Sequence, residues 1–167
     1  MNVNQFSAQF SEETKRKLDT ALRHWHAMAG QEAQRYFRGR FTEKEFDGTP
    51  WKPVSPGYHP KRGSLMVRTG ELMKSVRYVP RLSTKDKAVI VAGNYKVGYA
   101  KAHNEGFIGN VIVPTHERTS RKGKKYTVKE HTRKMNLPRR TFMASSRALE
   151  KKLAAETEKM IQYALKQ

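Results

Sequence analysis

Histidine and carboxylate side chains carry whatever acid–base or metal chemistry this chain could perform, and their spacing favours neither. The six histidines include no His-Glu-x-x-His or similar metal-binding pair: they are His24, His26, His59, His103, His116 and His131. His103-Asn104 with His131 comes nearest to a His-Asn-His nuclease. The strand–helix metal frame that such a nuclease needs is not visible in the sequence.

Acidic residues are scarce in the central part of the chain, where a catalytic site would need them. Residues 50–144 contain only five: Glu71, Asp86, Glu105, Glu117 and Glu130. The sequence also lacks a Gly-x-Ser-x-Gly elbow and a glycine-rich phosphate loop. The absence of cysteine excludes disulfides, thiolate zinc sites and thiol catalysis. We therefore expect no enzymatic activity, no cofactor and no metal site.

Basic residues are the strongest compositional signal. The chain has 34 Lys and Arg against 15 Asp and Glu, a net charge of +19, and residues 50–144 hold 21 of the basic side chains. The densest run lies in a predicted basic loop or hairpin at 115–136. We expect contact with an acidic partner or with phosphate here, through Arg118, Arg121, Lys122, Lys124, Lys125, Lys129, Arg133 and Lys134. A solvated, flexible loop is the alternative interpretation.

Two amphipathic helices flank the basic region. Apolar residues in steps of three and four over 18–37 predict a long N-terminal helix. Ser11 is a suitable N-cap for it and Gly39 a suitable end. A further stripe of apolar residues predicts a C-terminal helix after Pro138. The aromatic members of the first stripe are expected in the core: Trp25, Tyr36 and Phe37.

Short strands are predicted between the helices. Segments 76–82 and 87–92 are rich in β-branched and aromatic residues and predict an antiparallel hairpin. Residues 99–106 predict a short helix ended by Gly106, and 111–113 predict another strand. The order of elements predicts an α+β fold in one domain spanning 1–167. Its antiparallel sheet would be packed by the N-terminal and C-terminal helices.

A proline-rich segment separates the first helix from the strands. Residues 47–63 contain four prolines and three glycines, so neither a helix nor a central strand is expected there. The segment is predicted to form an extended arm that Trp51 pins to the body of the protein. A short helix is predicted to follow, with Thr69 as its cap.

Targeting and membrane segments are not expected. The first ten residues lack the basic start and apolar core of a secretory signal. The longest apolar run, Ala88–Ala92, is far shorter than the ~20 residues that a membrane span requires.

Four short motifs follow one another along the chain. They are Phe46-Asp47-Gly48-Thr49-Pro50-Trp51, Leu65-x-x-Arg68-Thr69-Gly70-x-Leu72-x-x-Ser75-Val76, Tyr99-Ala100-x-x-His103-Asn104-x-Gly106 and Leu137-Pro138-Arg139-Arg140-x-Phe142. In this order they resemble the phage virion morphogenesis family, which includes the G protein of phage Mu and is related to tail-completion proteins. The resemblance covers roughly residues 10–165.

The resemblance implies a structural protein of the neck of a tailed phage, found in the virion and in the host cytoplasm during assembly. Relatives form rings, usually of six copies, between a head-closure ring and a tail-terminator ring. The motif residues are expected to determine the fold and not to catalyse a reaction. They are Trp51, Thr69, Gly70, Tyr99, His103, Asn104, Gly106, Pro138, Arg139 and Phe142.

Two partners remain open for the basic loop. A cationic channel lining would bind the genome and slow its passage, because each phosphate contact adds sequence-independent affinity. An acidic face on a neighbouring ring avoids this problem and is favoured over DNA in the channel. The alternative function is a protein that binds nucleic acid without sequence specificity, whose affinity would fall steeply with salt.

Overall fold

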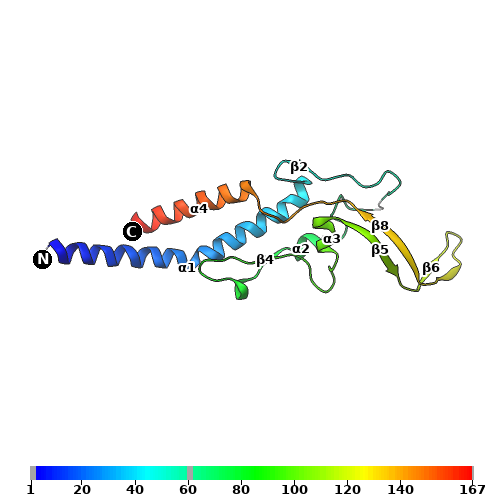
Figure 1. Ribbon diagram of the computed structural model, residues 1–167, viewed down its shortest axis with the longest axis horizontal. Helices are drawn as coiled ribbons and strands as arrows, with labels where there is room; N and C mark the ends of the chain where they lie inside the picture. Colours follow the sequence, from blue (N-terminus) through cyan, green and yellow to red (C-terminus); the bar gives the residue numbers. More distant parts are fainter. Residues whose placement is uncertain (1–2, 60–61, 167) are drawn as a thin grey trace.

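The computed structural model describes residues 3–59 and 62–166 of an elongated molecule (Figure 1). The free ends of the two long helices lie at one end, and a β-hairpin lies at the other. In chain order the elements are α1 (Val3–Glu43), β1 (Glu45–Phe46), β2 (Thr49–Pro50), α2 (Glu71–Ser75), β3 (Arg77–Tyr78), the 3-10 turn η1 (Pro80–Leu82), β4 (Ile90–Val91), α3 (Ala100–Glu105), β5 (Phe107–Val113), β6 (His116–Thr119), β7 (Lys125–Val128), β8 (His131–Leu137) and α4 (Arg147–Lys166). The predicted α+β class is confirmed.

Helix α1 is longer at both ends than the sequence predicted. It begins before Ser11 and continues past Gly39 to Glu43, so both predicted boundaries are wrong. A glycine inside a helix costs about 1 kcal/mol. Continuing the helix places Phe41 in the core with 1% of its surface exposed, and burying such a side chain contributes about 1.5–3 kcal/mol. The buried phenylalanine therefore outweighs the glycine.

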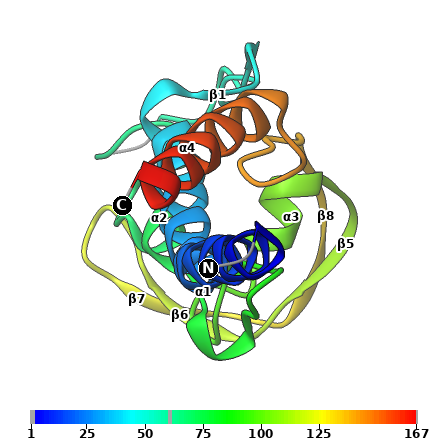
Figure 2. The same cartoon turned by 90° about the vertical axis from the view of Figure 1, so that its left-hand side faces the viewer.

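Helices α1 and α4 lie side by side and run in opposite directions (Figures 1 and 2). The indole N–H of Trp25 donates to the hydroxyl of Thr157 at 2.8 Å. Lys152 Nζ lies 2.6 Å from a carboxylate oxygen of Glu32, whose side chain is largely buried. Ser146 caps α4, because its hydroxyl accepts the backbone N–H of Leu149 at 3.2 Å. These contacts fix α4 against the middle of α1.

Within the described residues the strands form four separate two-stranded antiparallel sheets, and not the single sheet that the sequence predicted. β1 pairs with β2, and β3 with β4, which confirms the antiparallel pairing of 76–82 with 87–92. That hairpin is shorter than predicted because Pro80, which lacks a backbone N–H, begins a 3-10 turn.

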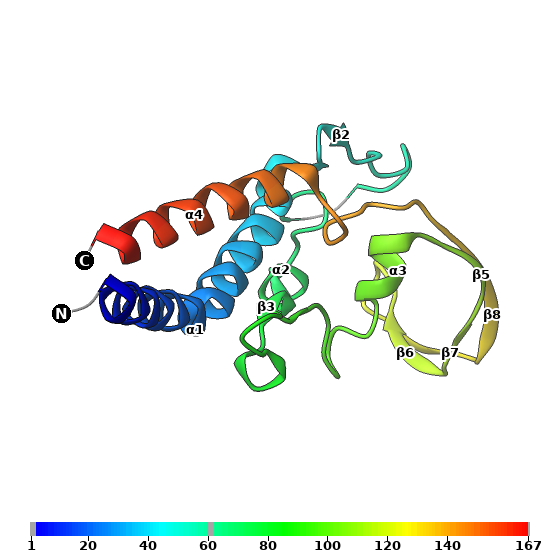
Figure 3. The same cartoon turned by 60° about the vertical axis from the view of Figure 1, so that its left-hand side comes forward.

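The remaining strands form a long, bent β-ribbon (Figure 3). β5 pairs with β8 over seven residues, from Phe107 opposite Leu137 to Val113 opposite His131. β6 then pairs with β7 over four residues, from His116 opposite Val128 to Thr119 opposite Lys125. The predicted basic loop at 115–136 is therefore a hairpin together with most of strand β8.

The hydrophobic core gathers around the C-terminal half of α1. Its buried members come from α1, the arm, α2 and its C-cap, the segment before α3, α3, the segment before α4 and α4 itself: Ala33, Phe37, Phe41, Trp51, Leu72, Val76, Val97, Ala100, Phe142 and Leu149. Of the predicted core aromatics, Phe37 is buried, while Tyr36 and Trp25 are half-buried. The core joins segments far apart in the sequence, which brings the four motifs together.

Candidate functional site

Three aromatic rings form the centre of the motif region. The ring of Phe41 lies edge-on to Trp51, with centroids 5.5 Å apart, and 5.0 Å from the ring of Phe142. The indole N–H of Trp51 donates to the carbonyl of Thr141 at 2.6 Å. Trp51 therefore fixes the beginning of the arm to the segment that leads into α4.

Asn104, on α3, holds the same segment through its side-chain amide. Its Oδ1 accepts the backbone N–H groups of Phe142 at 2.9 Å and Met143 at 3.0 Å. Its Nδ2 donates to the carbonyl of Met143 at 3.0 Å. The amide therefore takes the place of backbone partners for a stretch that belongs to no helix or strand.

Arg140 is a buried cation that holds the arm. Only 5% of its surface is exposed. Its guanidinium donates to the carbonyls of Lys52 at 2.7 Å and Pro53 at 2.9 Å, and its backbone N–H donates to the carbonyl of His103. One residue thus connects the arm, α3 and the segment before α4.

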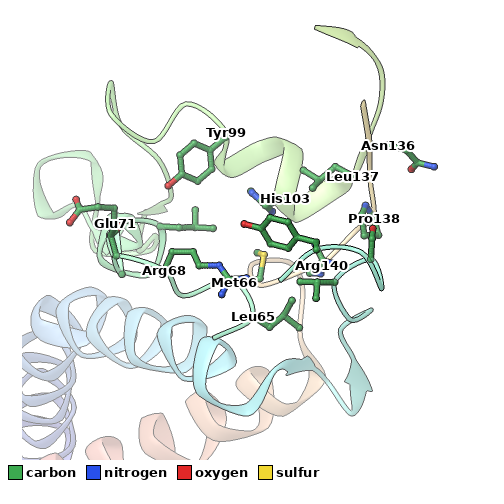
Figure 4. Close-up of a pocket in the computed structure, with 16 residues that line it drawn as sticks. Leu65, Met66, Arg68, Glu71, Tyr99, His103, Asn136, Leu137, Pro138 and Arg140 are labelled. Atoms are coloured by element: carbon green, nitrogen blue, oxygen red, sulfur yellow. The ribbon is translucent and has the colours of Figure 1, made fainter. Parts of the chain in front are cut away.

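A cavity of about 420 Å³ lies beside Arg140, between the arm, α2, α3 and the end of β8 (Figure 4). Five of the motif residues predicted to determine the fold line it: Thr69, Gly70, Tyr99, His103 and Pro138. Arg68 and Glu71 add one charge of each sign, and leucine and methionine side chains form part of the wall. The cavity is therefore lined by residues from three of the four motifs.

His103 is half-buried in this wall. Burial, and secondarily the charge of Arg140, hold the pKa of His103 below its usual value of 6.5, because both disfavour the charged imidazole. Its ring lies edge-on to Tyr99, with centroids 5.5 Å apart, and within the described part of the chain its Nδ1 has no hydrogen-bond partner.

The turns around the cavity depend on two motif glycines. Gly70 has φ 82° and is itself the N-cap of α2, without a side-chain cap, so the predicted capping role of Thr69 is wrong. Only glycine adopts this left-handed conformation at no steric cost. Gly106 ends α3 with φ 82°, and a Cβ there would lie 3.0 Å from the backbone nitrogen of Arg139. Arg139 itself is exposed, and its Nε donates to Thr141.

A cluster of polar side chains around Asp47 connects the first motif to α4. The Asp47 carboxylate accepts hydrogen bonds from the hydroxyl of Tyr36, from the hydroxyl of Ser146 at 2.6 Å and from the backbone N–H of Arg147 at 3.0 Å. The hydrogen bonds from Ser146 and then Tyr36 lower the pKa of Asp47 below its usual 3.8. Burial, together with the hydrogen bond to Asp47, raises the pKa of Tyr36.

This cluster predicts an acid-sensitive contribution to stability. Because the pKa of Asp47 is lower in the folded chain, its carboxylate stabilises the fold above pH 3.8, and the stabilisation is lost as the pH falls through the folded value. We expect Asp47→Asn to lower the free energy of unfolding at pH 7, by a difference that shrinks towards pH 3. Urea unfolding at both pH values measures this, and the exposed Asp86→Asn is the control. A difference that stays constant with pH would contradict the prediction.

The predicted contact residues of the basic loop are all exposed on the β-ribbon: Arg118, Arg121, Lys122, Lys124, Lys125, Lys129, Arg133 and Lys134. The first six lie on β6, β7 and the turns at their ends, and the last two lie on β8. Gly123, with φ 81°, allows the tight turn at the tip. This group is separate from the cavity residues, and it forms a protruding cationic surface.

The residues considered for a nuclease are not brought together. His103 precedes the near end of β5, whereas His131 pairs with Val113 at the far end of the seven-residue ribbon. Within residues 3–59 and 62–166, no three His, Asp or Glu side chains are grouped so that they could hold a metal ion. The described helices also include none with the length and apolar character needed to cross a membrane.

Comparison with known proteins identifies a family for the chain. The model of the phage virion morphogenesis family matches residues 4–165. The chain belongs to this family. No curated protein and no solved structure matches it. As a virion morphogenesis protein, it has a structural or assembly role in the phage virion and interacts with other virion components.

Sequence reasoning missed part of how this virion morphogenesis protein holds its arm. Asp47 and Arg140 were visible only as members of two motifs, and Tyr36 only as a core aromatic. The serine that caps α4, Ser146, gave one usable signal, because a serine just before an apolar helical stripe is a typical N-cap. Its contact with Asp47, 99 residues away in sequence, could not be seen.

Proposed function

We propose that the chain is a structural component of the neck of a tailed phage, where a ring of its copies completes the tail and joins it to the head. The ring would lie between the head-closure ring and the tail-terminator ring. The observation that carries the proposal is the family match over residues 4–165. The protein would act through assembly, in the virion neck, after being made in the host cytoplasm.

A closed ring of identical subunits needs two different, complementary faces on each copy. The arm at 47–63 supplies one candidate, since Trp51 and Arg140 anchor it while most of its residues are exposed. The edge of the β5–β8 ribbon supplies the other. Six copies, the usual number in relatives, would close the ring.

The cationic hairpin is assigned to an acidic face of a neighbouring ring. Eight exposed basic side chains against two acidic ones, Glu117 and Glu130, give residues 115–136 a strong positive charge. Opposite charges across two rings would fix their register and speed their encounter. The same charge along the channel would instead retain the DNA that must pass through it.

Electron microscopy of particles from a phage that lacks only this gene tests the proposal. We expect filled heads and separate, intact tails that do not join, and restoration of joined particles when the gene is supplied in trans. Normal infectious virions would contradict any virion role. Empty or leaking heads with tails attached would contradict head–tail joining and point to head closure.

The alternative is a protein that binds nucleic acid without sequence specificity. The observation that favours it is the protruding cationic hairpin, because a two-stranded β-ribbon fits the major groove of DNA. Such binding would weaken steeply between low and physiological salt. Steep salt dependence together with normal virions in the deletion would favour this alternative over the neck.

A further inference from the structure

Strand β5 has an edge that nothing in the described structure covers. One side of β5 is hydrogen-bonded to β8, and no backbone hydrogen bond joins its other side to any of residues 3–59 and 62–166. A two-stranded ribbon is only marginally stable in water, and a third strand or a packed face is needed to hold it. The free edge of β5 is therefore a site where another strand can add.

The two edges of the ribbon differ in their protection. β5 reads Phe-Ile-Gly-Asn-Val-Ile-Val, with no charge and no proline. β8 carries Arg133 and Lys134 in the middle of its length. Charged side chains and prolines are how natural proteins keep exposed edges from pairing. The charges on β8 thus disfavour pairing of its edge with another strand, whereas the edge of β5 has no such protection.

One face of β5 also exposes two large apolar side chains to solvent. Ile108 and Ile112 are 76% and 70% exposed, and the exposed Asn110 lies between them on the same face. Residues on the opposite face are half-buried. Because side chains alternate along a strand, Ile108, Asn110 and Ile112 form a row that reads the same in both directions.

We propose that β5 pairs with β5 of a second copy of this chain, antiparallel and centred on Asn110, to give a four-stranded sheet in the order β8-β5-β5-β8. In this register Ile108 lies opposite Ile112 of the partner subunit, and Ile112 opposite Ile108 of the partner subunit. Asn110 lies opposite its own copy. Cross-strand pairs of β-branched residues stabilise antiparallel sheets, and a two-fold contact requires such a self-complementary surface.

The other pairings of two ribbons fit less well. Joining β8 to β8 would bring Arg133 and Lys134 close to their own copies, and like charges across strands are destabilising. Joining β5 to β8 of another copy in the register found within the chain would set the two isoleucines opposite Thr132 and Asn136. Only the β5–β5 pairing covers isoleucine with isoleucine.

This dimer goes beyond the proposed neck function. The ring contact proposed above uses the ribbon edge, so a chain paired through β5 would have to release that edge before it enters a ring. The dimer is therefore the form of the protein outside the virion. If no dimer forms, the result expected for the gene deletion does not change. If the deletion contradicts the neck function, the dimer can still form.

Disulfide trapping tests the register. The chain has no cysteine, so a single Asn110→Cys substitution introduces the only thiol. Opposite residues of antiparallel strands have Cα atoms about 4.5–5.5 Å apart, within the range of a disulfide. We expect mild oxidation to convert Asn110→Cys into a covalent dimer. Lys134→Cys, opposite Asn110 on β8, leaves the β5 edge intact and should form little covalent dimer. Equal cross-linking of the two variants, or none for Asn110→Cys, would overturn the proposal.

The mass in solution tests the same contact without a cross-link. The unmodified chain should show a concentration-dependent equilibrium between 19.3 kDa and twice that mass by sedimentation. Ile108→Lys should weaken dimerisation by at least about tenfold while leaving the melting temperature of the monomer unchanged. Tyr95→Lys, at a side chain 90% exposed in a loop, is the control and should not affect it. A single 19.3 kDa species at every concentration, or a dimer that Ile108→Lys leaves intact, would overturn the proposal.

Discussion

Replacing Phe142 by alanine is expected to cost about 3–5 kcal/mol of the free energy of unfolding. The ring is 1% exposed and lies 5.0 Å from the ring of Phe41. Alanine would remove most of its apolar surface and leave a cavity between α1, the arm and the segment before α4. For a chain of this length we expect the melting temperature to fall by about 6–20 °C, measured by calorimetry or circular dichroism.

Two further variants make this prediction specific. Phe142→Leu keeps much of the volume and should cost clearly less than alanine, because a smaller cavity remains. Tyr95→Ala removes an aromatic ring that is 90% exposed and should change stability by no more than about 0.5 kcal/mol. A loss below about 1 kcal/mol for Phe142→Ala would show that the aromatic cluster does not hold the fold together.

The second large effect is expected at Asn104. Alanine there would remove the acceptor for the backbone N–H groups of Phe142 and Met143 and the donor to the Met143 carbonyl. A buried polar group left without a partner costs about 1–3 kcal/mol. Since these groups are partly buried and water can reach some of them, we expect a total loss of about 2–4 kcal/mol.

Hydrogen exchange gives this prediction a local readout. The amides of Phe142 and Met143 should exchange faster in Asn104→Ala than in the unmodified chain. Asn104→Asp keeps an acceptor for both N–H groups but loses the donor, so its stability should lie between the two. Lys101→Ala, at an exposed position on the same helix, is the control. Unchanged exchange at both amides would contradict the role of the Asn104 side chain in holding these backbone groups.

Local features of the fold could be predicted where a single residue decides the conformation. Gly106 ends α3 as expected, because its left-handed conformation favours glycine. The pairing of β3 with β4 was also visible from β-branched residues on either side of a turn. In both cases the decisive interactions lie within about fifteen residues of each other.

The remaining features depended on contacts that the sequence does not display. The end of α1 is set by the burial of Phe41 against Trp51 and Phe142, which overrides the helix-breaking tendency of Gly39. The separation of the strands into four two-stranded sheets was not predictable either, because periodicity within a strand does not show which strands pair.

In the candidate site, too, the sequence indicated which residues matter but not their long-range contacts. The resemblance picked out residues of four motifs, and the structure brings most of them to one region around the cavity. The contacts of Asn104 and Arg140 with segments 38 and about 88 residues away were not predictable. Side chains that bind distant backbone leave no local pattern, because the neighbouring residues in the sequence do not show which distant group will be the partner.

Helix α1 also has a mechanical consequence. Among the residues of α1 whose side chains are described, Ala29 is the first that is buried. The core therefore contacts only the C-terminal part of a helix about 60 Å long. The rest extends beside and beyond α4 (Figure 1). If it turns as one body, each degree of rotation at Ala29 would move the tip, about 39 Å away, by about 0.7 Å. Such a helix would act as a lever, in which a small rearrangement at the motif region gives a larger displacement at the opposite end of the molecule.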